Sequence, residues 1–206
     1  VYGATETGPF SIALGPEHAR SHMGSCGWPA LGVEARLDQA SPDGVGEVCL
    51  RGAAIVQRYW PDQPALDEHG WFHTGDLAVT HPDGYIKIKD RSKDIIISGG
   101  ENISSLEVED TLCRHPAVML AAVVAQPDPK WGETVQAVVV SKPDVSCSAE
   151  DLKAWCKQHL AGYKQPKRIV FMASADIPRT ATGKIVHRKL REHFTAQEAA
   201  TQALPA

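Results

Sequence analysis

The segment YGATE at residues 2–6 combines three side chains that could bind a nucleotide. The Tyr2 ring can stack on a purine base, and the Thr5 hydroxyl can donate a hydrogen bond to a phosphate oxygen. The Glu6 carboxylate supplies hard oxygen ligands, which Mg²⁺ prefers. Because the same five residues also suit an ordinary strand-to-turn segment, this pattern taken alone leaves both a nucleotide site and a plain turn open.

A carboxylate and a guanidinium farther along the chain could bind the hydroxyls of a sugar. Asp76 follows Thr74 and Gly75 at the end of an expected strand, where it can accept hydrogen bonds from both ribose hydroxyls. Arg91 comes fifteen residues later, and its planar fork of N–H donors suits two oxygen acceptors. A turn-capping aspartate and a solvated arginine at a strand end are the alternatives.

Lys184 is the candidate for stabilising charge at a phosphate. It ends the stretch PRTATGK at residues 178–184, before an expected helix, so we expect a mobile loop to carry it. One compact ammonium can offset the charge of two negatively charged reactants and of the transition state between them. The alternative is an ordinary loop lysine.

The stretch KDIIISGGEN at residues 93–102 ends an expected strand at a glycine pair. The isoleucines at 95–97 predict a strand buried on both faces, because β-branched side chains suit a packed, pleated surface. Gly99 and Gly100 look like a phosphate-cradling turn, but the neighbouring Glu101 would repel a phosphate. We therefore expect the pair to serve another purpose, and the role of Glu101 stays open.

The elements that must position these residues form two blocks in an α+β fold. Short alternating runs from residue 32 to 89 predict a β-rich subdomain, as a small barrel or curled sheet. After residue 90 we expect a helix that opens at Ser104 in a capping box and ends at Pro116. Further strands at 117–125, 134–141 and 168–172 and helices at 148–161 and 184–194 complete a small α+β domain. The predicted domains are 1–89 and 94–195, with a hinge at 90–93 and a disordered tail at 196–206.

Composition excludes several classes of protein. The 206 residues are 43% apolar and 22% charged, which is typical of a globular protein. A formal net charge of −4 provides no basic surface for nucleic acid, and no apolar run approaches the roughly 20 residues of a membrane span. The five cysteines form no CxxC pair, which favours reduced thiols and a cytoplasmic location. His18 and His22 have helical spacing but no third ligand nearby, so a metalloprotein is disfavoured.

Four stretches taken together and in order resemble the adenylate-forming superfamily, which contains acyl-CoA synthetases, luciferases and peptide-synthetase adenylation domains. They are YGATE, WFHTGD at 71–76, DRSKD at 90–94 and PRTATGK. The resemblance implies that Tyr2 flanks adenine, Thr5 contacts the α-phosphate and Glu6 binds magnesium. It also implies that Asp76 and Arg91 hold the ribose, that Lys184 is catalytic, and that Lys93 is the residue about which the C-terminal domain swivels.

The resemblance also implies a path for coenzyme A. Trp131, in the segment WGE, would flank the pantetheine tunnel, and Gly99 and Gly100 would form its bare wall. The implied reaction joins a short-chain, medium-chain or aromatic carboxylic acid to CoA through an acyl-adenylate, with ATP converted to AMP and pyrophosphate.

The start at Val1 without a methionine leads us to expect the C-terminal part of a longer enzyme, inactive as an isolated fragment. The family's phosphate-binding loop and acyl pocket would lie upstream of that residue. Two alternatives remain open: loading of a carrier-protein phosphopantetheine, and a non-catalytic binding module. The state of oligomerisation is not predicted.

Overall fold

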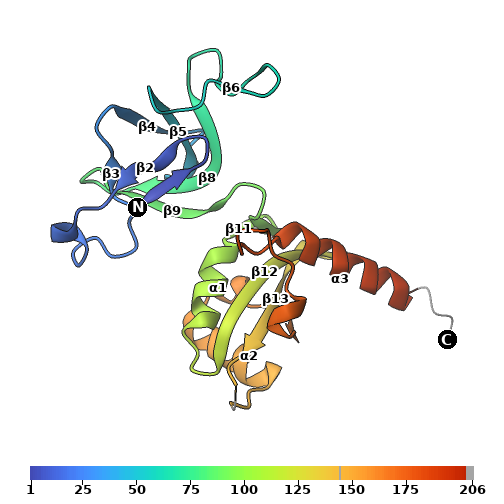
Figure 1. The fold of residues 1–206 in the computed structure, drawn as a ribbon. Helices are drawn as coiled ribbons and strands as arrows, with labels where there is room; N and C mark the ends of the chain where they lie inside the picture. Colours follow the sequence, from blue (N-terminus) through green and yellow to red (C-terminus); the bar gives the residue numbers. More distant parts are fainter. Residues whose placement is uncertain (144, 203–206) are drawn as a thin grey trace. The chain divides into compact units, whose positions relative to one another are not determined.

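The computed structural model describes residues 1–143 and 145–202 of the chain. Contacts between residues divide it into two units, Val1–Lys93 and Asp94–Ala206 (Figure 1). We call them the first and the second unit and describe each by itself. None of the described helices combines the length and the apolar character that a membrane span requires.

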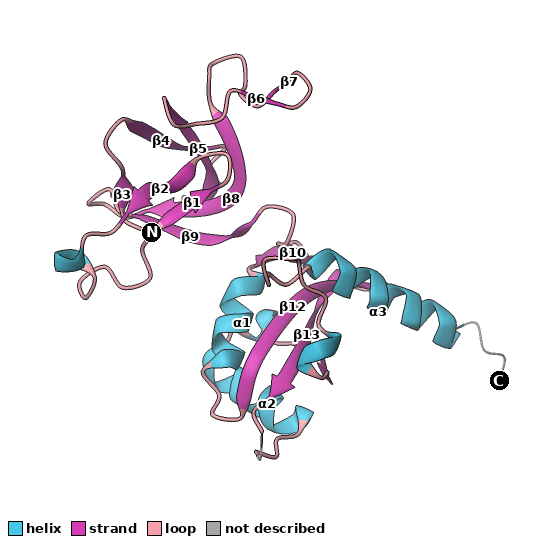
Figure 2. Ribbon diagram, viewed as in Figure 1, coloured by secondary structure: helices cyan, strands magenta, loops and turns pink. Residues whose placement is uncertain are grey.

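The regular elements of the first unit are almost all antiparallel strands, joined by loops (Figure 2). A three-stranded sheet has the order β1-β2-β3, a four-stranded sheet has the order β4-β5-β8-β9, and β6 pairs with β7. The bounds are β1 Tyr2–Ala4, β2 Gly8–Ala13, β3 Trp28–Pro29, β4 Val33–Asp38, β5 Gly46–Gly52, β6 Arg58–Tyr59, β7 Gln63–Pro64, β8 Phe72–Thr80 and β9 Ile86–Arg91, with a 3₁₀ turn at Pro16–His18.

Alternating residues of these strands build the core of the first unit. Val48 and Leu50 of β5 point to the same face and are fully buried with Ile12 of β2, while Phe72 and Ile86 complete the cluster. The expected strands and the hairpin between β8 and β9 are therefore confirmed. The expected barrel or curled sheet is not found: within the described residues the four-stranded ladder runs open from β4 to β9, and β1 to β3 form a separate ladder.

The second unit is a mixed sheet with helices on both faces. Its strands follow the order β11-β10-β13-β12, and β14 runs parallel to β13. The strands are β10 Ile96–Ser98, β11 Glu101–Ile103, β12 Val118–Asp128, β13 Gly132–Ser141 and β14 Arg168–Phe171. The helices are α1 Ser105–Cys113, α2 Ala149–His159 and α3 His187–Gln202, with 3₁₀ turns at Gly162–Lys164 and Ser174–Asp176.

The two faces of this sheet bury separate clusters. Val123 of β12 faces the cluster that contains Leu112 of α1 and Leu152 of α2. Its neighbour Val124 faces the other cluster, which contains Leu190 and other residues of α3. Because successive strand residues point to opposite faces, α1 and α2 cover one face and α3 the other. This arrangement confirms a β-rich part followed by a small α+β part.

Several predicted elements differ from the observed ones. The isoleucine strand is buried on one face only: Ile96 is 0% exposed and Ile97 is 55% exposed. The reason is that Ile96 packs into the cluster beneath α1 and α2, whereas Ile97 points to the opposite face and belongs to neither of the two described clusters. The last helix runs to Gln202, so the predicted disordered tail is helical up to that residue. Residues 203–206 of that tail lie outside the described residues.

Candidate functional site

Tyr2, Asp76 and Arg91 meet in the first unit. The Tyr2 hydroxyl donates to Asp76 Oδ2 at 2.6 Å across 74 positions of sequence. Arg91 Nε lies 3.0 Å from the other carboxylate oxygen, Oδ1, because Asp76 of β8 and Arg91 of β9 are cross-strand partners. The structure thus brings three residues that were predicted from separate motifs into one hydrogen-bonded cluster.

The turn before Asp76 fixes the main chain at this cluster. The Thr74 hydroxyl donates to the Val48 carbonyl at 2.8 Å and accepts the Asp76 N–H at 3.1 Å. Gly75 between them has φ of +73°, a left-handed conformation that glycine adopts without a steric penalty. The TGD sequence is therefore a rigid bend in β8 that aims the carboxylate.

Burial and hydrogen bonding set the protonation state of Tyr2. Burial of the Tyr2 side chain raises its pKa far above the ordinary value, and its bond to the Asp76 carboxylate acts in the same direction. Tyr2 is therefore a neutral donor at physiological pH. Each carboxylate oxygen of Asp76 thus receives one donor, from Tyr2 or from Arg91.

Thr5 and Glu6 lie in the turn between β1 and β2. Thr7 holds this turn: its buried hydroxyl accepts the Ala4 N–H at 2.9 Å, and its own N–H donates to the Ala4 carbonyl at 3.1 Å. Thr5 is exposed, and among the described residues Glu6 Oε1 receives a long contact of 3.4 Å from the Tyr59 hydroxyl. The Glu6 carboxylate therefore fits the oxygen chemistry of a magnesium ligand.

Gly99 and Gly100 form the two-residue turn of a β-hairpin in the second unit. Their φ values of +59° and +88° suit the turn types that join tightly paired strands, here β10 and β11. The Gly99 N–H donates to the Trp131 carbonyl at 2.8 Å. A Cβ at Gly99 would lie 2.8 Å from Cε3 of the Trp131 ring, whereas a Cβ at Gly100 would meet nothing within 4 Å. The first glycine thus allows the indole to lie against bare backbone.

Charged side chains surround this Trp131 ring. The ammonium groups of Lys130 and Lys167 lie 4.7 Å and 5.4 Å from ring centroids of Trp131. The Glu133 carboxylate accepts the Ile97 N–H at 2.9 Å and so ties the hairpin to β13. Glu101 pairs with Ser98 across the hairpin and is exposed.

Lys184 ends a tight turn that is closed by main-chain hydrogen bonds. The Thr180 N–H donates to the Lys184 carbonyl at 2.8 Å, and the Lys184 N–H donates to the Thr180 hydroxyl at 3.1 Å. Arg179 adds a bond from Nη1 to the Gly183 carbonyl at 3.0 Å. The Lys184 backbone is thus hydrogen-bonded within a turn of the second unit, and the residue itself is exposed.

Sequence reasoning missed the residues that support these sites. Tyr59 contacts Glu6, whereas Thr7 and Glu133 bind main-chain N–H groups near predicted site residues, at Ala4 and Ile97. Their signal was weak, because each is a common residue type within an ordinary strand or turn. Only the second threonine of TET could have been recognised, as a side chain placed to bond back to its own turn.

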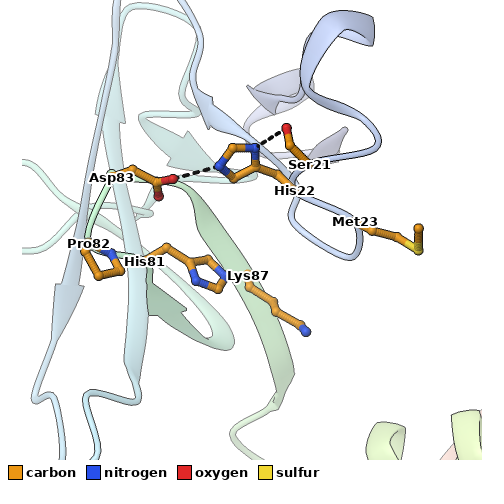
Figure 3. A pocket seen from close by; sticks show the side chains of 7 residues that line it. All are labelled: Ser21, His22, Met23, His81, Pro82, Asp83 and Lys87. Atoms are coloured by element: carbon orange, nitrogen blue, oxygen red, sulfur yellow. Dashed lines mark hydrogen bonds and ion pairs between the residues drawn. The ribbon is translucent and has the colours of Figure 1, made fainter.

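A pocket on the first unit is separate from these residues (Figure 3). His22 Nε2 lies 2.7 Å from Asp83 Oδ2, and the Ser21 hydroxyl lies 2.9 Å from His22 Nδ1. The rings of His22 and Tyr85 stack with centroids 3.7 Å apart. The helically spaced histidines noted in the sequence therefore belong to a surface network. The lining residues are Ser21, His22, Met23, His81, Pro82, Asp83 and Lys87, none of which is a predicted site residue.

Comparison with known proteins identifies both units. The profile of the AMP-binding enzyme family matches residues 1–60, and that of the AMP-binding enzyme C-terminal domain matches residues 107–184. An acetate–CoA ligase of Humulus lupulus is 54% identical over 155 residues, covering 71% of this chain and 27% of the relative. A feruloyl-CoA synthase of an Amycolatopsis species is 39% identical over 201 residues, covering 94% of this chain and 40% of the relative.

Solved structures agree with these matches. The o-succinylbenzoate CoA synthetase of Bacillus subtilis in complex with its acyl-adenylate intermediate has a TM-score of 0.85 and 34% identity, covering 92% of this chain and 40% of that chain. The same synthetase has also been solved with ATP and a magnesium ion. The chain thus spans two fifths or less of the length of these relatives. It belongs to the AMP-binding, adenylate-forming enzyme family, in which it matches the C-terminal portion of acyl-CoA ligases.

Proposed function

We propose that this chain is the C-terminal part of an ATP-dependent acyl-CoA synthetase. The carboxylic acid attacks the α-phosphate of ATP to give acyl-adenylate and pyrophosphate, and the CoA thiol then displaces AMP. The observation that carries the proposal is the cluster of Tyr2, Asp76 and Arg91, which presents a fixed carboxylate beside a guanidinium in a chain of this family.

In the first half-reaction the chain binds and orients the nucleotide. Asp76 and Arg91 hold the ribose hydroxyls, and Tyr2 flanks the adenine while its hydroxyl keeps the Asp76 carboxylate in place. Thr5 donates to the α-phosphate. Glu6 would hold Mg²⁺, which neutralises phosphate charge when bound. Lys184 contacts the carboxylate and the α-phosphate oxygens, because a single ammonium can offset the charge that both bring together.

In the second half-reaction the second unit presents a different face. We propose that it rotates about Lys93, which withdraws Lys184 and brings the turn of Gly99 and Gly100 to the acyl-adenylate. The bare backbone of Gly99 and the Trp131 ring would line the path of the pantetheine arm. Separating the two steps in this way keeps the reactive mixed anhydride from water.

The acid is proposed as a short-chain, medium-chain or aromatic carboxylic acid. Relatives named for acetate, butyrate, trans-cinnamate and ferulate support this class, whereas one relative is named for long-chain fatty acids, and the names select no single member. We propose a cytoplasmic location, although two of these relatives are named as peroxisomal.

A carrier-protein thiol is the second candidate acceptor. A relative from Streptomyces coeruleorubidus, 40% identical over 210 residues, is named a fatty acid–[acyl-carrier-protein] ligase. CoA is favoured here because the other relatives cited above are named for CoA. A binding module without turnover is the third possibility, and measurable pyrophosphate release by the full-length protein would exclude it.

The test is a pair of half-reaction assays on the full-length protein with Lys184→Ala. Adenylation, measured as acid-dependent pyrophosphate release, should fall by at least about a hundredfold, because such transition-state contacts typically contribute that much. Thioester formation from supplied acyl-adenylate should stay within a few-fold of the unsubstituted protein. Lys157→Ala, on the exposed face of α2, removes the same charge and should change neither step.

Equal losses in both half-reactions would argue against the rotation. Unchanged pyrophosphate release would remove Lys184 from the mechanism. We expect the 206-residue chain by itself to show neither half-reaction, and turnover by this chain alone would overturn that expectation.

A further inference from the structure

A hydrogen-bonded row of polar side chains crosses the polar face of the four-stranded sheet in the first unit. Glu47 Oε2 of β5 lies 2.8 Å from His73 Nδ1 of β8, and the other ring nitrogen of His73 lies 3.3 Å from Asp67 Oδ2. The Asp67 carboxylate also accepts the Trp71 N–H at 2.8 Å, at the start of β8. Both nitrogens of the His73 ring are therefore engaged by carboxylates.

The second oxygen of Glu47 reaches the bend that carries Asp76. Glu47 Oε1 accepts the Gly75 N–H at 2.8 Å. Gly75 is the left-handed residue of the TGD bend, so this bond holds the peptide immediately before the carboxylate that faces Tyr2 and Arg91. One carboxylate thus links the imidazole to the main chain of the proposed ribose site.

We propose that Glu47 and His73 are positioning residues for Asp76. His73 orients Glu47 by binding its Oε2 atom, and Glu47 fixes the Gly75 peptide by accepting its N–H at Oε1. The inference rests on the proposed nucleotide site. It adds to that site two side chains that touch no ligand themselves and act through the bend.

The surroundings of His73 support a charged imidazole. Its hydrogen bond to Glu47 is the largest cause that raises the pKa of His73 above its ordinary value, and Asp67 acts in the same direction. The pair therefore contributes stability in full below the unfolded pKa of His73 and loses it as the pH rises through the higher folded pKa. The TGD bend should therefore be held most firmly at pH values below the pKa of His73 in the folded protein.

The other groups near the imidazole lie on β4 and β5. Burial and the charges of Glu47 and Asp38 raise the pKa of the Cys49 thiol to about 11, so it is a neutral neighbour, 3.4 Å from His73 Nδ1. Arg36 of β4 lies 3.7 Å from Asp38 and 3.9 Å from Asp67. Metal-binding atoms of Asp38, Cys49 and His73 lie within 4.8 Å of one another, so a metal ion is an alternative that the experiment must exclude.

The experiment is a pH titration of the 206-residue chain by ¹⁵N-resolved NMR, with Glu47→Gln as the variant. In the unsubstituted chain the Gly75 and Asp76 amide shifts should follow the same midpoint as the His73 ring. In Glu47→Gln the His73 pKa should fall, and this shared midpoint should disappear while other amide shifts are retained. The matched control is Glu34→Gln, on the neighbouring strand of the same face, which removes a carboxylate bound to Arg51 at 2.6 Å and should leave the midpoint unchanged.

A second measurement connects the bend to the ligand. The affinity of the chain for AMP should fall about tenfold in Glu47→Gln, as expected when a hydrogen bond from a charged group is lost near a site. It should also weaken in the unsubstituted chain as the pH rises through the His73 midpoint. Equal AMP affinity in the unsubstituted protein and in Glu47→Gln would overturn the positioning role. Amide shifts of Gly75 and Asp76 that do not follow the His73 midpoint would also overturn it.

Two further outcomes distinguish the positioning role from the proposed nucleotide site and from a metal site. If the amide shifts follow His73 but no AMP binds at any pH, the link from Glu47 to the bend stands and the proposed nucleotide site fails. If Zn²⁺ added alone binds at one equivalent and abolishes the His73 titration, the cluster is a metal site and the positioning role is wrong.

Discussion

Replacing Gly99 with alanine tests the contact between the hairpin turn and Trp131. The residue lies at φ of +59°, which costs any L-residue about 1–2 kcal/mol. Its new Cβ would lie 2.8 Å from the Trp131 ring, and overpacking of this kind costs about 1–3 kcal/mol more. We therefore expect Gly99→Ala to lower the free energy of unfolding of the second unit by about 2–5 kcal/mol.

Gly100→Ala is the matched control for this prediction. Gly100 also has a positive φ, of +88°, but a Cβ there meets nothing within 4 Å. The control should therefore lose only about 1–2 kcal/mol. The difference between the two variants isolates the contact with Trp131, because both carry the same added methyl group in the same turn.

Urea unfolding followed by circular dichroism and by tryptophan fluorescence measures both effects. In a Trp131→Ala background the difference between the two glycine variants should disappear, as a double-mutant cycle requires. Equal losses for Gly99→Ala and Gly100→Ala in the presence of Trp131 would refute the close approach. In the full-length protein Gly99→Ala should slow thioester formation more than adenylation if the turn lines the thiol path.

Two substitutions test the packing of the units. Leu112→Ala in α1 removes a fully buried side chain and should lower the free energy of unfolding by about 2–5 kcal/mol in urea, whereas a change below about 1 kcal/mol would contradict its core position. Tyr2→Phe removes the donor to the buried Asp76 carboxylate and should lower the free energy of unfolding by about 1–3 kcal/mol. Tyr85→Phe is its control, because the ring stacked on His22 is retained and Asp76 is not touched.

The fold could be predicted where local pattern and turn chemistry agree. The Asp83-Gly84 hairpin and the helix begun by Ser104 both appear as expected. The ladder between β12 and β13 runs farther than predicted, to the pair Asp128 and Gly132. Its length is set by pairing with another strand, which overrides the turn preference of the prolines nearby.

The pattern of the isoleucines was ambiguous for a similar reason. A run of three β-branched residues predicts a strand, but burial on both faces requires a neighbour on each side of the sheet. Ile96 packs into the cluster beneath α1 and α2, but Ile97 points to the opposite face and belongs to neither described cluster, so it stays exposed. Which elements cover each face is a property of the whole unit and is not contained in the ten residues around Ile97.

The candidate site could be predicted only as separate motifs. Spacing indicated an acceptor at Asp76 and a donor at Arg91, but it could not place the Tyr2 hydroxyl on that same carboxylate. Glu47 shows most clearly which contacts the sequence cannot predict. It alternates as an ordinary solvent-facing strand residue, and only the bulge between β5 and β8 brings its carboxylate to the Gly75 N–H.

The distribution of these contacts also bears on the proposed rotation. Arg91 is held in the first unit by its pairing with Asp76, and the Ser92 N–H donates to the Gly75 carbonyl at 2.8 Å. A rotation that began before Ser92 would break these bonds and disturb the ribose site. The contacts of Trp131 and Lys184, in contrast, lie within the second unit. A pivot at Lys93, as proposed above, would leave both of these sets of contacts intact.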